Sequence, residues 1–361
     1  MNTPVSSVAA STAGINRSSS SVQRFLWVTI VLVVAVVVWG AVVRLTSSGL
    51  SIPDWPLING SLLPPFSEAG WEAVQEDYRL EAIRLGKTGY PADLTVPAFR
   101  TAFWIEYMHR ALAATVGLVF FWAMFQGFRN QAVKQKVEVN FFILAALLLA
   151  QAGLGGVVVI GALHSALVAI HLVVAYCFFA LLIWTVLALT RREHSTAGGS
   201  RSAGFQPINW ALITAVLTLL QVAVGGLVAG TGAASILNTY PLMAGSIIPP
   251  SDLLWNPVDG SVVLNGVLVQ FVHRWLPFLL LVAFIVLRFK TLRTPLGGRA
   301  VILFRATAAL LGLQIIVGIF NLLYRAPVIL SALHSGIALL FFGGMVVILH
   351  DLRYEAGEGA R

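Results

Sequence analysis

Long apolar runs separated by short polar connections dominate the pattern of this 361-residue chain. A helix needs about 20 mainly apolar residues to cross a membrane, and eight segments satisfy this. The pattern predicts an all-α, polytopic membrane protein with eight transmembrane helices. The predicted helices cover residues 25–44, 102–128, 139–160, 166–190, 208–230, 264–287, 300–323 and 328–350.

A short repeat divides these helices into two sets of four. The sequence PLINGSLLPP at 56–65 matches PLMAGSIIPP at 241–250, at an offset of 185 residues. The same offset relates Gly40 to Gly225. Because each set has an even number of helices, both copies keep the same orientation in the membrane. We therefore predict two tandem four-helix bundles in a parallel pseudo-two-fold repeat.

The repeat also predicts the division of the chain into regions. Within the long extracytoplasmic loop, Ser67 precedes a run of acidic residues and predicts the start of a helix. That helix is interpreted as a solvated surface helix, and a lid or a docking surface is the alternative. The expected regions are a disordered cytoplasmic tail at 1–24, an N-terminal bundle at 25–190 with its loop at 45–101, a cytoplasmic linker at 191–207, a C-terminal bundle at 208–350 and a cytoplasmic tail at 351–361.

Composition and charge agree with this topology. The chain is 58% hydrophobic and 11% charged, far from the quarter that is usual in soluble domains. Its net charge of +8 is better explained by membrane topology than by nucleic-acid binding, and Cys177, the single cysteine, excludes an intramolecular disulfide. Basic residues concentrate in the tails and even-numbered connections, which predicts that both termini are cytoplasmic. They are Arg17, Arg24, Arg129, Lys134, Lys136, Arg191, Arg192, Arg201, Arg288, Lys290, Arg293, Arg299, Arg305, Arg353 and Arg361.

Four of the seven histidines occupy equivalent places in the two copies. His109 and His273 begin the second and sixth spans, and His171 and His334 begin the fourth and eighth, all toward the non-cytoplasmic face. Two imidazoles from different helices of one bundle are suited to bind a haem iron from both faces. A haem also carries anionic propionates, for which Arg110 and Arg274, directly after the first histidine of each pair, are candidate partners. The sites predicted are therefore His109, His171 and Arg110 in one half, and His273, His334 and Arg274 in the other.

Other interpretations of the histidines carry less weight. A lone histidine in a membrane helix is more often a hydrogen-bond partner between helices, but four at duplicated positions favour haem. Zinc is disfavoured because a second cysteine is absent and only one of the four histidines has an acid nearby. His164, His194 and His350 are assigned no chemical role, and His164 is expected in a loop or at a helix start.

Glu106 breaks the symmetry between the halves, because Gln270 occupies the equivalent position. Glu106 lies three residues before His109, so both side chains share one helix face. It also lies four residues before Arg110, and the spacing is equally compatible with a simple salt bridge. A carboxylate can accept a proton where a glutamine cannot, which suggests that one haem site reacts while the other holds its haem or carries electrons.

The sequence GAVVRLTSSGL at 40–50, together with EYMHR, VHR and LHSG, resembles the haem A synthase family over residues 25 to 350. The resemblance implies an eight-helix protein that oxidises the C8 methyl of haem O to a formyl group, with water as the oxygen source, to give haem A for cytochrome c oxidase. It also implies the bacterial inner membrane, with the mitochondrial inner membrane as a less favoured alternative. Expected partners are haem O, the lipid bilayer, haem O synthase and an electron acceptor. Nucleic acid is not expected, and a homo-oligomer is left open.

The resemblance further implies a division of roles. His273 and His334 would hold one tightly bound haem b, and His109 and His171 would receive haem O. Glu106 would be required for the chemistry. Some relatives carry a cysteine pair in the first extracytoplasmic loop, whereas this chain has Ile52 and Ile58 there. Alternative functions are a di-haem b-type electron carrier without chemistry on the haem, and a non-catalytic haem carrier.

Overall fold

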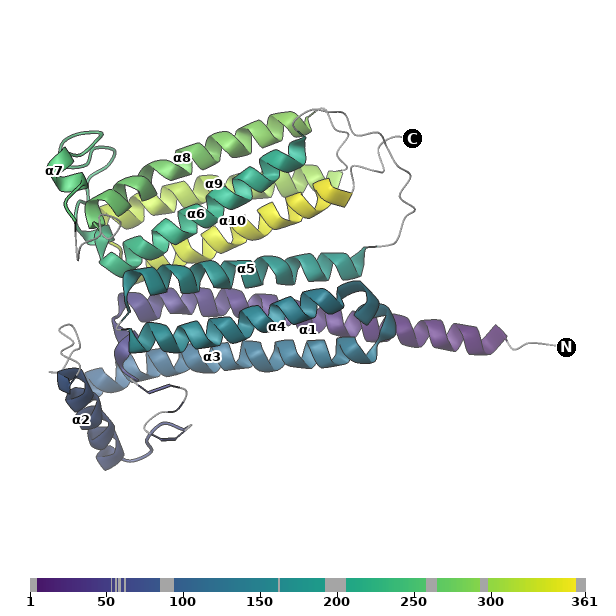
Figure 1. Ribbon diagram of the computed structural model, residues 1–361, viewed down its shortest axis with the longest axis horizontal. Coiled ribbons are helices and arrows are strands. Elements are labelled where there is room, and N and C mark those ends of the chain that lie inside the picture. The colour runs from purple at the N-terminus through teal and green to yellow at the C-terminus, as the bar shows by residue number, and fades with distance from the viewer. Residues whose placement is uncertain are drawn as a thin grey trace.

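Helices make up nearly all of the computed structural model of this protein (Figure 1). It describes residues 5–52, 54–55, 57, 60–61, 63–84, 94–161, 163–191, 206–257, 265–292 and 298–354. His194, Ile58 and most of the predicted linker and C-terminal tail lie outside the described residues. The long helices are α1 (Val5–Leu45), α3 (Val96–Arg129), α4 (Gln131–Ile160), α5 (Ser165–Thr190), α6 (Pro207–Thr231), α8 (Gly266–Thr291), α9 (Gly298–Leu323) and α10 (Val328–Tyr354).

Among the described residues, eight helices are long and apolar enough to cross a membrane, which confirms the predicted fold class. Helix α1 differs from expectation, because it begins at Val5 and continues through a region predicted to be disordered. The portion of α1 suited to a membrane starts at Ser20. The Ser-rich segment before it continues the same helix through Gly14, and it contains no proline after Pro4 to interrupt the hydrogen-bonding pattern.

Local sequence fixes several helix starts. Asn130 accepts hydrogen bonds from the backbone N–H groups of Ala132 and Val133, and so caps the N-terminus of α4. Asn265 caps α8 in the same way. Helices α3 and α6 begin with a proline in their first turn, where its missing N–H costs nothing.

The long helices form two groups of four. Helices α1, α3, α4 and α5 lie in one group, and α6, α8, α9 and α10 in the other (Figure 1). Helix α1 packs on α3 as α6 packs on α8, and α4 packs on α5 as α9 packs on α10. This order fits the predicted tandem repeat. The groups meet where α1 and α5 pack against α6 and α10, and the aromatic rings of Tyr176 and Phe342 lie 5.4 Å apart across this interface.

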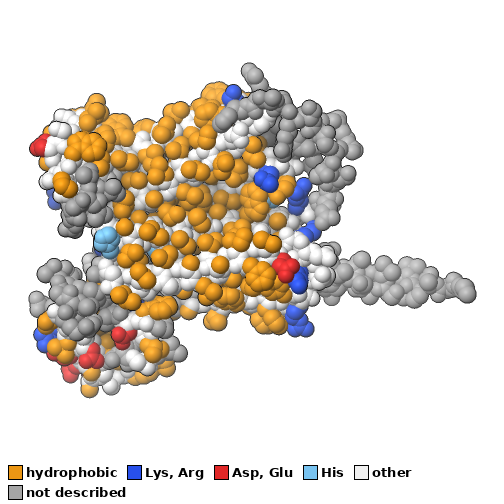
Figure 2. Space-filling view, viewed as in Figure 1, with side chains coloured by type: hydrophobic (Ala, Val, Ile, Leu, Met, Phe, Trp, Pro, Cys, Tyr) orange, Lys and Arg blue, Asp and Glu red, His pale blue; other side chains and the backbone are white. Residues whose placement is uncertain are grey.

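Apolar side chains also cover the outside of the bundle. Leu118 and Ile329 are each 75% exposed, and hydrophobic side chains cover the face of the bundle shown in Figure 2. Such a surface matches a lipid environment, where the hydrocarbon replaces the protein core as the apolar partner. Lysine and arginine side chains gather at the end of the bundle where α1 protrudes (Figure 2), and both chain termini lie at that end (Figure 1).

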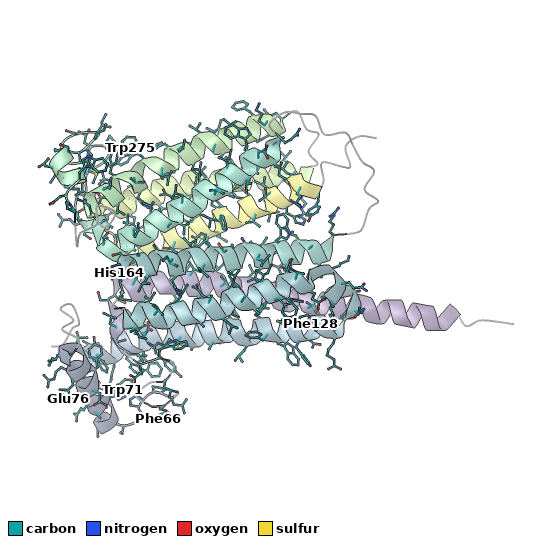
Figure 3. All side chains as sticks on the ribbon, in the orientation of Figure 1. Phe66, Trp71, Glu76, Phe128, His164 and Trp275 are labelled. Atoms are coloured by element: carbon teal, nitrogen blue, oxygen red, sulfur yellow. The ribbon has the colours of Figure 1, made fainter. Side chains whose placement is uncertain are left out.

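At the opposite end, the loop after α1 contains η1 (Ser48–Leu50) and α2 (Glu68–Arg84). The Ser67 hydroxyl accepts a hydrogen bond from the Gly70 N–H, which confirms the predicted helix start. Helix α2 is not solvated all round, since Trp71 and Tyr78 on it are buried against Phe99 and Phe103 of α3. The prediction of a solvated surface helix is therefore only partly right, because one face of α2 is aromatic and packs against α3. The labels of Trp71 and Glu76 in Figure 3 mark the inner and outer sides of α2.

An ion pair secures the beginning of α2. Arg100 on α3 donates a hydrogen bond to the Glu68 carboxylate, and its guanidinium also lies 5.2 Å from the centre of the Trp71 ring. The hydrogen bond from Arg100 lowers the pKa of the Glu68 carboxyl. Polar and aromatic contacts thus hold α2 against the end of α3 that leads to Glu106. The corresponding loop of the second half contains η2 (Ala233–Ser235) and the single turn α7 (Ser251–Leu254).

Candidate functional site

The second half brings two predicted histidines together. His273 on α8 and His334 on α10 face one another with ring centres 6.3 Å apart and planes at 69°. A histidine nitrogen binds a metal at about 2 Å, and the ring centre lies roughly 1 Å beyond that nitrogen. Two imidazoles that bind one metal from opposite sides therefore have their centres about 6 Å apart. The observed spacing therefore fits a metal held between the two rings.

The first half has a comparable pair. His109 on α3 and His171 on α5 lie near enough to interact electrostatically. All four imidazoles are surrounded by protein, yet each retains some accessible surface. Trp275, two residues after His273, lies at the same end of the bundle as His164 (Figure 3), which is the end that also contains α2. The structure therefore places His273 at that end, and it brings His273 close to His334 and His109 close to His171.

Each of the four imidazoles packs against a glycine on a neighbouring helix. An added Cβ at Gly40 or Gly225 would lie 3.1 Å from Cε1 of His109 or His273, respectively. An added Cβ at Gly155 would lie 3.6 Å from Cε1 of His171, and one at Gly318 would lie 2.9 Å from Cε1 of His334. These contacts between glycines and histidines were not predicted from the sequence. Their register with the histidines is visible in the repeat, because Gly155 and Gly318 each come 16 residues before their histidine.

Three glutamines also contact the histidines. The side-chain nitrogen of Gln151 lies 3.1 Å from Nε2 of His171, and that of Gln314 lies 3.1 Å from Nε2 of His334. Gln221 approaches Nδ1 of His273 to 3.0 Å. Each of these glutamines therefore bonds across to the histidine of another helix, a pairing that was not predicted from the sequence. The signal available was the interval of 20 residues that separates the glutamine from the histidine in both halves.

Glu106 is buried and forms an ion pair with Arg110. Arg110 Nε donates a hydrogen bond of 2.8 Å to Glu106 Oε1, and the Glu106 residue is only 4% exposed. The salt bridge that the spacing allowed is therefore present. The same guanidinium donates bonds of 2.6 Å to the carbonyl oxygens of Ile52 and Asp54 in the loop after α1. Arg110 thus fastens this loop to the helix that contains Glu106 and His109.

The second half has a corresponding clamp, that is, an arginine bonded to two loop carbonyls and to the side chain four residues before it. In this half that side chain is uncharged. Arg274 donates a hydrogen bond of 2.9 Å to Gln270 Oε1 and further bonds to the carbonyl oxygens of Leu237 and Thr239. Leu237 and Thr239 are the repeat equivalents of Ile52 and Asp54, at the offset of 185. The side-chain nitrogen of Gln270 donates a hydrogen bond of 2.6 Å to the carbonyl oxygen of Ala233. The two sites therefore share this arrangement, but the side-chain partner of the arginine is a carboxylate in the first half and a neutral amide in the second.

The two clamps predict unequal losses of stability when the arginine is removed. Arg110→Met leaves a buried carboxylate without a cation, which costs about 3–5 kcal/mol. Arg274→Met leaves only neutral polar groups unpaired, which costs about 1–3 kcal/mol. Thermal unfolding in detergent should therefore show the larger decrease in melting midpoint for Arg110→Met. Adding Glu106→Gln to Arg110→Met should recover part of that decrease, and a double variant no more stable than Arg110→Met would contradict the explanation.

His164 and His350 lie away from these pairs. His164 is exposed at the N-terminus of α5, as expected for a helix-start residue (Figure 3). His350 is buried near the opposite end of α10, where its ring meets the edge of Trp184 at 5.0 Å. In the part of the chain that the structure describes, no three His, Cys, Asp or Glu side chains come together as a metal cluster. A haem iron requires only two protein ligands, because its porphyrin supplies the others.

Comparison with known proteins gives a consistent family. Residues 23–346 match the model of a family described as cytochrome oxidase assembly protein. A protein named haem A synthase from Nitrosospira multiformis is 32% identical over 344 residues, covering 92% of this chain and 93% of that protein. Proteins of the same name from Ruegeria pomeroyi (33% identity, 91% of this chain and 87% of that protein) and Beijerinckia indica (32%, 97% of both) are similar. With its eight spanning helices and bacterial relatives, this is a multi-pass membrane protein, and the chain belongs to the haem A synthase family.

Proposed function

We propose that this protein is a haem A synthase that oxidises the C8 methyl group of haem O to a formyl group, for use in cytochrome c oxidase. The observation that carries the proposal is the pairing of histidines in both halves with a buried carboxylate in only one. A carboxylate can accept a proton from a substrate, whereas the glutamine in the other half cannot. The relatives named haem A synthase support haem A as the product.

In this proposal the C-terminal half holds haem b. His273 and His334 would hold its iron, and their 6.3 Å ring separation supports this assignment. When bound, haem b supplies a one-electron redox centre. Arg274 is the proposed partner for a propionate, since a guanidinium has five N–H donors and its remaining ones can meet an anion beside the loop that it already fastens. The protein's part is to orient the two imidazoles and to surround the ring with apolar side chains.

The N-terminal half would receive haem O as substrate between His109 and His171, with Arg110 beside a propionate. Each hydroxylation of the methyl group adds the oxygen of one water and releases two protons and two electrons. Two such steps give a geminal diol, which loses one water to become the aldehyde. The electrons require an acceptor outside the substrate, which is expected to be a membrane redox partner reached through the C-terminal half.

Glu106 is the proposed acceptor for the protons released at the methyl group. Its ion pair with Arg110 stabilises the ionised form of the carboxylate, which is the form that can accept a proton. A proton taken by Glu106 weakens its bond to Arg110, so that Arg110 and the loop carbonyls of Ile52 and Asp54 would respond to each step. A general base at such a site contributes roughly 10²–10⁴-fold to the rate.

The proposed orientation places both termini in the cytoplasm and both haem sites near the outer side of a bacterial inner membrane. The gathering of basic side chains at the end near both termini supports this orientation (Figure 2). Haem O synthase is the expected supplier of the substrate. Its product, haem O, is highly apolar and would therefore travel to this protein within the bilayer.

The test is pigment analysis of membranes that express this chain, with and without a supply of haem O. We expect haem A only where both the chain and haem O are present. Recovery of haem O unchanged, despite a bound haem b, would overturn the enzyme assignment and leave a haem carrier.

One observation favours a second candidate, a di-haem b-type electron carrier. Glu106 and Gln270 make the same bond to the arginine four residues later, so the carboxylate could serve only to hold the loop. This candidate requires two equivalent, tightly held haems and no change in haem chemistry when Glu106 becomes glutamine. The Glu106→Gln variant therefore separates the two functions.

The glycine beside His334 gives an independent check on the haem b site. A methyl group at Gly318 would lie 2.9 Å from Cε1 of His334, so Gly318→Ala must displace the imidazole. We expect the haem b content of the purified protein to decrease at least about tenfold, since even a ligand's neighbours affect metal affinity by 10–100-fold. Gly312→Ala on the same helix is the control, because an added Cβ there meets no described atom within 4 Å. Equal haem content in the two variants would contradict the assignment.

A further inference from the structure

Glutamines accompany three of the four proposed haem ligands. Gln151, Gln221 and Gln314 lie on α4, α6 and α9, and each approaches the histidine of an adjacent helix at 3.0–3.1 Å. Gln221 additionally donates a hydrogen bond of 3.0 Å to the backbone carbonyl of His273. Each glutamine thus bonds one particular imidazole.

These pairs leave complementary atoms without partners. Among the described residues, the side-chain oxygens of all three glutamines are buried and accept no hydrogen bond. Nδ1 of His171 and Nδ1 of His334 are likewise buried without a partner. If the glutamine amide and the imidazole each rotated by half a turn, the glutamine oxygen could accept a hydrogen bond from the histidine Nδ1–H. The histidine Nε2 would then be free to bind a metal. Amide orientation and histidine tautomer are set by such partners.

The rearranged pair is the one that metal ligation requires. A histidine that binds a metal through one nitrogen almost always donates its other N–H to an acceptor, which fixes the ring plane and raises the basicity of the ligand. Losing that acceptor typically lowers metal affinity 10–100-fold. A glutamine oxygen at this place would stabilise the iron–histidine bond without supplying a charge.

His109 lacks such a partner. A Cβ added to Gly40 would lie 3.1 Å from Cε1 of His109, and one added to Gly225 would lie 3.1 Å from Cε1 of His273. These matching contacts make Gly40 on α1 the equivalent of Gly225 on α6. In that alignment Val36 occupies the position of Gln221, one helical turn before the glycine. Among the described residues His109 has no hydrogen-bond partner for Nδ1. Val36 is instead packed against the hydrophobic core.

We propose that Gln151, Gln221 and Gln314 are positioning residues that accept the free ring N–H of three haem ligands, and that Val36 leaves His109 as the one unsupported ligand. The iron–His109 bond is then the weakest of the four, and haem enters and leaves the N-terminal half by way of that bond. This inference rests on the proposed function, because it assigns unequal strength to ligands of a resident haem and an exchanging one.

The reciprocal exchange of these residues tests the inference. Purified protein loaded with haem b and haem O is mixed with excess apomyoglobin, and haem transfer is followed by absorbance. The wild type should show a fast phase from the N-terminal half and a slow phase from the C-terminal half. Val36→Gln should slow the fast phase about 10–100-fold, and Gln221→Val should accelerate the slow phase about 10–100-fold.

Three further variants make the outcome decisive. Gln221→Glu retains an acceptor oxygen and should keep the slow phase slow, which a purely structural loss would not do. If Gln221→Val does not fold, Val36→Gln decides alone. Rates within about twofold of wild type for Val36→Gln would overturn the inference. His273→Ala should abolish the slow phase, and His109→Ala the fast one. If these histidine variants leave both phases intact, the failure lies in the proposed function itself.

Discussion

Replacing Glu106 by glutamine is expected to decrease haem A formation at least about 100-fold, while haem b remains bound. General base catalysis contributes 10²–10⁴-fold, and glutamine cannot accept a proton. The substitution changes little else, because Gln270 makes the same 2.9 Å bond to its arginine in the other half. Glutamine at 106 should therefore preserve the bond to Arg110 and, through Arg110, the position of the loop.

The measurement is the ratio of haem A to haem O extracted from membranes, together with the absorption spectrum of the purified variant. The double variant Glu106→Gln, Gln270→Glu is the matched control, because it restores one carboxylate but in the other half. It should remain inactive if only the N-terminal site reacts. Undiminished haem A in Glu106→Gln would defeat the base role and favour the di-haem carrier.

Substituting either histidine of the C-terminal pair is expected to remove the resident haem spectrum. His273 and His334 come from different helices with their rings 6.3 Å apart, so neither can replace the other. Loss of one of the two histidines that would hold the iron should decrease haem b content more than about tenfold, since even a residue that only hydrogen-bonds to a metal ligand affects metal affinity by 10–100-fold. Haem A formation should cease with it, because the electrons from the methyl group lose their route.

The N-terminal pair provides the comparison. His109→Ala and His171→Ala should retain the haem b spectrum and lose only the conversion of haem O. Haem per protein and the spectrum of the reduced form distinguish the two classes of variant. If all four substitutions affect haem b equally, the division of roles between the halves is wrong.

Helix number and the pairing of histidines were predictable because both leave strong periodic signals. Eight apolar runs of membrane length are hard to misinterpret, and a repeated His-Arg pair locates equivalent positions. The starts of α3 at Val96 and α4 at Gln131 were not predicted, because each helix extends past its apolar run into polar turns. The tail before Ser20 was expected to be disordered, yet the helix continues to Val5.

The contacts of the polar side chains were only partly predictable. Spacing allowed the Glu106–Arg110 pair, but the loop carbonyls that Arg110 also meets lie more than 50 residues away in sequence. The contact of Gly40 with His109 depends on the packing of α1 on α3, which no local pattern encodes.

The most direct measurement is electron cryo-microscopy of the protein loaded with haem b and haem O. We expect two porphyrins on the side of α2: one with its iron between His273 and His334, and one with its iron between His109 and His171 and its reactive edge near Glu106. A porphyrin bound outside these pairs, or ligands drawn from both halves around a single iron, would contradict the account.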